Sequence, residues 1–354
     1  MVAKALSVAL LAGAASATCP LSVQISNSDA HVVSVAVTNT GSETLQVFKG
    51  NTVFSDHATK DLLVTDAEGN ALPFQGIYVN YKRQGLDAGA FQKIDAGETV
   101  TVSVNAAKSY KLEGIDEAKI TAIQGFRYAT GAEAPADFKS LASCDDVTSG
   151  EVAVTPDQAV VAEQHISRRN SPTRSRVEKR SITYSSCSAS QTSALKTSVS
   201  NAISMAKAAS TAAGTSSYYY TTWFKSTSVV SKVQTIYNDV AGVQTTSPKI
   251  SCTDTYSDCT DGSALLYTVP DDNVIVPCPN NGFWGFPELA SQCSGDDYDR
   301  AGSMLHEMTH LYGTGDYGYG YVAAQALSAT RAAANADTYE MYAESVRLGG
   351  CTVG

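Results

Sequence analysis

A basic segment in the middle of the chain limits what this sequence can fold into. Six Lys and Arg residues lie between positions 168 and 180, only Glu178 opposes them, and Ser, Asn and Pro fill most of the gaps. Such a composition cannot bury enough apolar surface to form a core. The chain has 354 residues, more than one ordinary domain. We therefore expect a multidomain protein with two folded parts, joined by a linker over residues 165–180.

The first residues have the features of a secretory signal peptide. Lys4 supplies a positive charge, residues 5–15 are apolar, and Ala15-Ser16-Ala17 is a small-residue cleavage site. The apolar run is shorter than the roughly 20 residues that a membrane span requires. We expect cleavage after Ala17, export from the cell and no membrane anchor.

Export decides how the basic linker is interpreted. A basic arm that binds nucleic acid is one possibility, but an exported chain does not favour it. We interpret the segment as a processing site that a dibasic-cleaving protease cuts after Lys179-Arg180. This divides the chain into a signal peptide (1–17), a propeptide (18–180) and a mature part (181–354).

The propeptide is expected to be a β-sandwich over residues 18–145. Val33, Val35 and Val37 alternate with other residues, and Asn39-Thr40-Gly41 then turns the chain. Short alternating runs between regular turn signals are typical of sandwiches. Cys19 and Cys144 bracket this region and could join its ends.

The mature part is acidic and is expected to be mainly helical. It has 8 Lys and Arg against 15 Asp and Glu, and 8 − 15 gives a charge of −7. Helices are predicted over residues 189–213, 218–240, 296–312, 323–334 and 337–347, and a hairpin or small sheet over 250–276.

Six of the eight cysteines fall in the mature part, an even number that in an exported protein indicates disulfides. Sequence alone does not choose among the 15 possible pairings of six cysteines. We expect pairing in order along the chain: Cys187 with Cys252, Cys259 with Cys278, and Cys293 with Cys351.

The chemistry is concentrated in His306-Glu307-Met308-Thr309-His310. On a helix, side chains at positions i and i+4 share one face, so two imidazoles there can bind one zinc ion. Glu307 can then act as general base on an attacking water. His306 and His310 are the only histidines after Arg180. The alternative, two unrelated surface histidines, is therefore not favoured.

A catalytic zinc site needs a third protein ligand. Gly313 can end the helix and let the chain turn back, so that Asp316 follows His310 at a metzincin-like spacing. The alternative for Asp316 is a turn residue that bonds its own backbone. Asp337, Glu340 and Glu344 are competing ligands.

The segment from Gly313 to Gly320 reads Gly-Thr-Gly-Asp-Tyr-Gly-Tyr-Gly and fits the pattern GTxDxxYG. Together with the HExxH motif, and with residues 335–339 (Asn-Ala-Asp-Thr-Tyr), it resembles the deuterolysin family of fungal neutral proteases, the aspzincins. A snapalysin-like metzincin is the alternative, but no convincing Met-turn is present.

The resemblance implies a mainly α (α+β) zincin-like catalytic domain that holds one zinc through His306, His310 and Asp316. It also implies that Glu307 is the base and that Tyr319 faces the reacting carbonyl, where a phenol can stabilise an oxyanion. A packed core tyrosine is the alternative for Tyr319.

The expected function is hydrolysis of peptide bonds in protein substrates by a secreted, monomeric endopeptidase. The charge of −7 could attract basic substrates or serve only solubility, and the resemblance implies a preference for basic proteins. A zinc-scavenging protein and a structural β-protein are the non-peptidase alternatives. The propeptide is expected to keep the enzyme latent. A Cys19–Cys144 disulfide is preferred to a free cysteine on the zinc.

Overall fold

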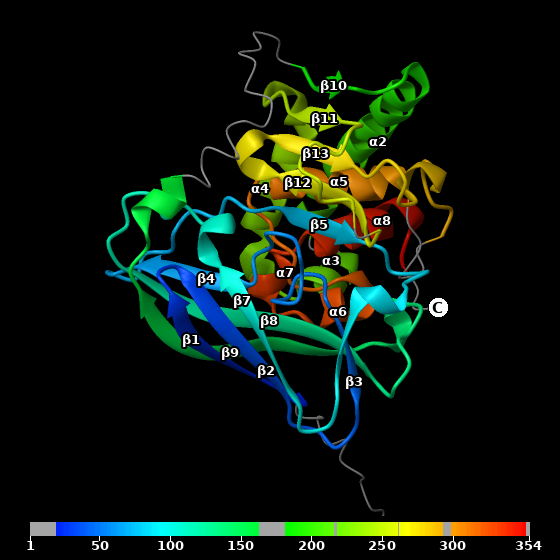
Figure 1. Ribbon diagram of the computed structural model, residues 1–354. Coiled ribbons are helices and arrows are strands. Elements are labelled where there is room, and N and C mark those ends of the chain that lie inside the picture. The colour runs from blue at the N-terminus through cyan, green and yellow to red at the C-terminus, as the bar shows by residue number, and fades with distance from the viewer. Residues whose placement is uncertain (1–18, 163–180, 216–217, 261, 293–298, 352–354) are drawn as a thin grey trace, which may run out of the picture.

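The structure is a computed structural model that describes residues 19–162 and 181–351, apart from 216–217, 261 and 293–298 (Figure 1). The expected signal peptide, the whole linker (165–180) with the pair Lys179-Arg180, and Cys293 lie outside these residues. Figure 1 shows a mostly β N-terminal region below a helical C-terminal region.

The N-terminal region is built from two β-sheets. One sheet has three strands in the order β1-β2-β7, and the other has the order β4-β8-β3-β6 with β9 paired to β8. Their bounds are β1 Leu21–Asp29, β2 Val32–Asn39, β3 Leu45–Phe48, β4 Leu62–Asp66, β6 Phe91–Ile94, β7 Thr99–Asn105, β8 Ala118–Thr130 and β9 Ala142–Val154. The expectation of a β-rich region is confirmed, although its last strand continues beyond residue 145.

Alternation in the sequence explains the sandwich. Val33, Val35 and Val37 are all fully buried in β2, and they share one core with Leu45 and Val64 of the other sheet. Side chains two residues apart on a strand point to the same face, so the two sheets bury their apolar faces against each other. The expected disulfide between Cys19 and Cys144 is present.

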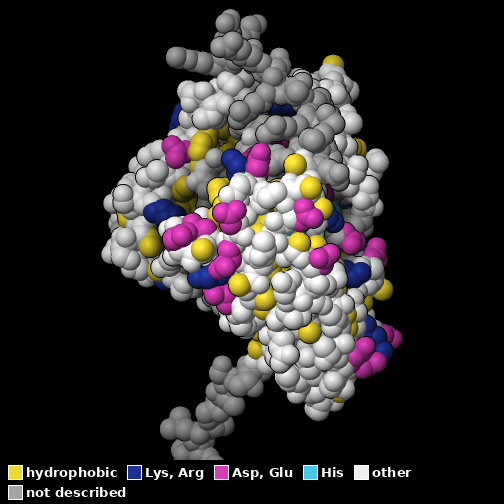
Figure 2. All heavy atoms as spheres, turned by 60° about the vertical axis from the view of Figure 1, so that its left-hand side comes forward, with side chains coloured by type: hydrophobic (Ala, Val, Ile, Leu, Met, Phe, Trp, Pro, Cys, Tyr) yellow, Lys and Arg dark blue, Asp and Glu magenta, His cyan; other side chains and the backbone are white. Residues whose placement is uncertain are grey.

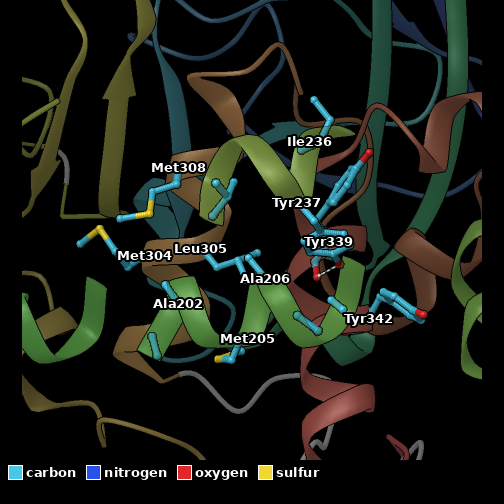
Figure 3. Packing of buried hydrophobic residues seen from close by; sticks show 14 of the residues in the cluster. Ala202, Met205, Ala206, Ile236, Tyr237, Met304, Leu305, Met308, Tyr339 and Tyr342 are labelled. Carbon is cyan, nitrogen blue, oxygen red and sulfur yellow. Dashed lines mark hydrogen bonds between the residues drawn. The ribbon is translucent and has the colours of Figure 1, made fainter. Parts of the chain in front are cut away.

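The C-terminal region is mainly helical. Its helices are α2 Ala189–Gly214, α3 Tyr218–Phe224, α4 Val230–Ala241, α5 Arg300–His310, α6 Gly320–Ala326, α7 Ala329–Ala332 and α8 Ala336–Leu348. Figure 3 shows how side chains of α2, α4, α5 and α8 meet in one apolar core, with Leu305 of α5 near its centre. This core fixes α5, the helix that carries the HExxH motif.

Two of the expected helices are interrupted. The prediction of one helix over 218–240 is wrong, because Lys225 has a left-handed backbone (φ 64°) between α3 and α4. The prediction over 323–334 is also too long, since Leu327 is extended and Ser328 caps a new helix, α7. Helical periodicity continued across both breaks, so the pattern alone did not reveal them.

The disulfides of the C-terminal region agree with pairing in order. Cys187 bonds Cys252 and Cys259 bonds Cys278. Cys351 is also disulfide-bonded, and its expected partner, Cys293, lies outside the described residues.

A third sheet joins the two regions. Its order is β10-β11-β13-β12-β5, with β10 Thr183–Ser185, β11 Lys249–Ser251, β12 Ala264–Val269 and β13 Val274–Pro277. The edge strand β5, Tyr78–Tyr81, comes from the N-terminal region and pairs antiparallel with β12. The small sheet expected in the C-terminal region is therefore present, but it is completed by the other region.

The surface carries charges of both signs. The whole chain has a net charge of −10, yet acidic and basic side chains are interspersed on the face drawn in Figure 2. Within the described residues, no helix combines the length and the apolar character needed to cross a membrane.

Candidate metal centre and catalytic site

Helix α5 begins at a conventional cap and buries almost all of its length. The Asp299 carboxylate accepts a hydrogen bond from the Gly302 amide at 2.5 Å, which satisfies a donor left free at the helix start. Met304, Leu305 and Met308 pack into the helical core. The remaining polar face, with both motif histidines, is buried as well.

Two imidazoles and one carboxylate converge at the end of α5. Nε2 of His306 lies 3.3 Å from Oδ1 of Asp316, and Nε2 of His310 lies 3.4 Å from the same oxygen. These three atoms are buried, and none makes a hydrogen bond within the described part of the protein. Buried polar atoms need a partner, and two histidines with one carboxylate are a donor set that suits zinc. The residues therefore fit a zinc ion.

The loop that carries Asp316 is fixed by its own turn and by a distant asparagine. Gly313 has a φ of 92°, which lets the chain leave the helix and turn back. The amide oxygen of Asn335 accepts hydrogen bonds from the Tyr317 and Gly318 amides at 2.8 and 3.0 Å. The Asn335 amide nitrogen donates to the Gly318 carbonyl at 2.9 Å.

The other imidazole nitrogens have partners that orient the rings. Nδ1 of His306 lies 2.9 Å from Oδ1 of Asp337, and Nδ1 of His310 lies 3.2 Å from the Thr314 carbonyl oxygen. Such contacts would orient the Nε2 atoms of both rings toward an ion bound between them.

Glu307 lies beside this centre and is fully buried. The Thr268 hydroxyl on β12 donates a hydrogen bond to its Oε2 at 2.6 Å, while Oε1 has no partner within the described residues. Burial raises the pKa of Glu307 to about 8, although the charge of His306 and the Thr268 bond oppose this shift. A carboxyl group that titrates near neutral pH can accept and return a proton.

Tyr319 is buried at the same centre. Its ring is nearly parallel to that of His306, with the centroids 6.3 Å apart. Its hydroxyl donates to the Val79 carbonyl at 2.5 Å and accepts from the Asn51 amide at 2.6 Å. Both partners belong to the N-terminal region.

The competing carboxylates are not part of the group that the two imidazoles form with Asp316. Asp337 and Glu340 approach the Nδ1 side of His306, where the three residues form a second group of possible metal ligands. Glu344 instead accepts a hydrogen bond from Arg347 at 2.5 Å. Among the three, only Asp337 and Glu340 are adjacent to a motif histidine.

Arg83 of the N-terminal region occupies the acidic pocket beside His306. Its guanidinium lies 2.8 Å from Asp337 and 3.4 Å from Glu340, and the Arg83 side chain is fully buried. Burial would raise the pKa of Asp337, but the charges of Arg83 and His306 outweigh it and hold that pKa below its usual range.

Sequence reasoning did not anticipate Arg83, Asn51 or Thr268, because each is far from the motif in the chain and carries no motif of its own. Asn335 had a signal, since it opens the segment Asn-Ala-Asp-Thr-Tyr, but its role in holding the Asp316 loop was not anticipated.

Comparisons with known proteins identify the family of the chain. Residues 209–344 match the aspzincin family, which is described as lysine-specific metallo-endopeptidase. Two proteins from Phaeosphaeria nodorum, each called a neutral protease 2 homolog, are 35% and 33% identical to the chain. The alignments cover 93% and 96% of this chain and 91% and 98% of the two relatives. A neutral protease 2 homolog from Botryotinia fuckeliana is 32% identical over 90% of this chain and 89% of its own length.

The chain is accordingly a zinc metalloendopeptidase. More specifically, it belongs to the deuterolysin, or aspzincin, family.

Proposed function

We propose that this protein is a secreted endopeptidase whose single zinc ion is held by His306, His310 and Asp316. The observation that carries the proposal is the convergence of two imidazole nitrogens and one carboxylate oxygen, all buried and without hydrogen bonds in the described residues, beside Glu307. A zinc ion bound there would lower the pKa of a water molecule and polarise a peptide carbonyl.

The residues of the chain have separate roles in this proposal. Glu307 accepts the proton of the attacking water and later returns it to the leaving amine. Thr268 holds the Glu307 carboxylate in place through the bond to Oε2. The Tyr319 phenol donates a hydrogen bond to the carbonyl oxygen as negative charge develops on it.

A preference for basic substrates is supported by the acidic pocket of Asp337 and Glu340. In this structure, a guanidinium occupies that pocket, fully buried. A Lys or Arg side chain of a protein substrate could make the same contacts once Arg83 has left. The charge of the C-terminal region, 8 − 15 = −7 over residues 181–354, adds a weaker attraction at long range.

The proposal includes maturation. The chain is made with a signal peptide (1–17), exported, and cut by a dibasic-cleaving protease after Lys179-Arg180, which leaves residues 181–354 as the monomeric enzyme. Support comes from the sequence and from the relatives, which match the chain over nearly its whole length.

Zinc content and azocasein hydrolysis, measured side by side on the processed chain freed of its N-terminal fragment, test the assignment. We expect one zinc and hydrolysis in the wild type, loss of both in Asp316→Ala, and loss of hydrolysis alone in Glu307→Gln. Zinc retained by Asp316→Ala would move the third ligand to Asp337 or Glu340. Zinc without hydrolysis in the wild type would instead support a zinc-scavenging protein.

A further inference from the structure

Strand β5 covers the edge of the sheet nearest the candidate site. It pairs antiparallel with β12, so that Tyr78 lies opposite Thr268 and Val79 opposite Tyr267. The Lys82 amide extends the contact with a hydrogen bond of 2.8 Å to the Ser263 carbonyl. Extended peptides commonly bind proteins by adding a strand to a free sheet edge in this way. Without β5, β12 would be that free edge.

The side chains of β5 reach the site as well. The Tyr78 ring stacks on the His310 imidazole, with centroids 4.4 Å apart and planes 10° apart. Asn80 lies two residues further along the strand and therefore faces the same side of the sheet as Tyr78. The Asn80 side chain is fully buried, and both polar atoms of its amide lack a hydrogen bond within the described residues.

The hydroxyl of Tyr319 is fully engaged by the N-terminal region. It donates to the Val79 carbonyl and accepts from the Asn51 amide. A phenol has one proton to donate, so this bond excludes a bond from Tyr319 to a substrate carbonyl. The Val79 carbonyl thus takes the place that the proposed mechanism gives to the scissile carbonyl.

Arg83 adds a buried charge contact to the backbone pairing. Its removal from the pocket would leave the Asp337 carboxylate without its cationic partner, in a place where neither side chain has any exposed surface. Separating a buried ion pair in this way is strongly unfavourable when the partner stays buried. Arg83 therefore stabilises the docked arrangement.

An apolar cluster makes the interface extensive. It contains side chains from both regions, among them Phe48, Val79 and Tyr81 from the N-terminal region and Tyr267, Val276 and Tyr319 from the C-terminal region. His57 and Asp258, 3.1 Å apart, add a polar contact across the interface. None of the three disulfides between described residues joins the two regions.

We propose that the N-terminal region is a non-covalent inhibitor that binds the catalytic region as a substrate-like strand through β5 and Arg83. Cutting the linker after Lys179-Arg180 then does not open the site, and activity appears only when the N-terminal fragment dissociates or is destroyed. The proposal rests on the proposed endopeptidase function, since it identifies what blocks that same site.

The experiment uses the full chain with the recognition sequence of a site-specific protease in place of residues 174–180. After the cut, size-exclusion chromatography measures whether the two fragments still elute together. Hydrolysis of an internally quenched peptide that contains lysine measures whether the site is open. The variants are Arg83→Ala, Asn51→Gly and, as control, Lys108→Ala, whose side chain is exposed to solvent on a short helical turn.

In the wild type and in Lys108→Ala, we expect the fragments to elute together and hydrolysis to stay low. The affinity between the two fragments should differ by no more than about twofold between these two proteins. Arg83→Ala should weaken the binding of the fragments about 100-fold, because it leaves carboxylates buried without their partner. Asn51→Gly should weaken it about tenfold through loss of one hydrogen bond. Glycine accepts the φ of 54° at this position, so the substitution adds no backbone strain.

Separation of the wild-type fragments on cutting, or full hydrolysis while they still elute together, would overturn the proposal and leave the peptidase intact. If Arg83→Ala does not fold, Asn51→Gly still tests the contact. Absence of hydrolysis in every separated, zinc-loaded variant would reject the endopeptidase function instead, and the elution profiles would still report on the interface.

Discussion

Removal of the Asn335 side chain should release the loop of Asp316, the proposed third metal ligand, without changing Asp316 itself. Asn335 is fully buried and makes four hydrogen bonds. It accepts from the Tyr317 and Gly318 amides and donates to the Gly318 carbonyl and the Thr338 hydroxyl, at 2.8 to 3.0 Å. Asn335→Ala removes all four.

The magnitude follows from the number of these bonds. A typical intramolecular hydrogen bond contributes about 1 kcal/mol net, and a buried group left unpaired costs about 1–3 kcal/mol. Four lost bonds, with some relaxation of the loop, should therefore lower stability by about 4 kcal/mol. Since the loop holds Asp316 against both histidines, zinc affinity should fall about 10- to 100-fold, as for other residues that orient metal ligands.

Zinc affinity measured by competition with a chromophoric chelator, alongside denaturant unfolding, checks this expectation. Asn201→Ala is a control, because Asn201 lies on helix α2 and its side-chain amide donates a hydrogen bond of 3.0 Å to Glu288. Zinc affinity within about twofold of wild type in Asn335→Ala would refute the argument that this side chain positions Asp316.

Three other substitutions test separate parts of the structure. Thr268→Val removes the hydroxyl that holds Glu307 and should lower kcat about tenfold at unchanged zinc content, and an unchanged kcat would remove Thr268 from the mechanism. Leu305→Ala opens a cavity in the helical core of Figure 3 and should lower the free energy of unfolding by about 2–5 kcal/mol, measured with denaturant. Burial raises the pKa of Asp61 from 3.8 to about 7. Between these two pH values the folded state keeps a proton on Asp61 that the unfolded state has lost. Stability should fall by up to about 4 kcal/mol as pH rises from about 4 to 7. Asp61→Asn should abolish this dependence and be more stable than wild type at higher pH, whereas parallel pH profiles of stability would contradict the linkage.

The site illustrates how far local spacing carries a prediction. The separation of His306 and His310 by one helical turn, and the Gly313 turn before Asp316, are properties of neighbouring residues. The structure places these three side chains around one point. Arg83 and Asn51 lie more than 200 positions from the residues that they contact. No periodicity or motif in a single sequence connects such distant positions.

The fold shows the same division. The alternating valines of β2 follow the two-residue period of a strand, and the apolar face of α5 follows the 3.6-residue period of a helix. Both periods can be read in the sequence, and both elements formed as expected. The breaks at Lys225 and Leu327 did not follow from these periods, because they depend on single backbone conformations and on caps.

The sequence by itself indicated the candidate chemistry of this protein: a pair of histidines, a glutamate between them and an aspartate, at spacings that a helix and a turn bring together as a candidate metal site. It also indicated the β-rich and helical regions, whereas the pairing of the described cysteines came from the structure. Only the tertiary structure decided that β5 completes the catalytic sheet and that Arg83 fills the acidic pocket. The physical reason is that a sheet edge and a buried carboxylate accept any strand or cation of suitable shape, and which one arrives depends on how the whole chain packs.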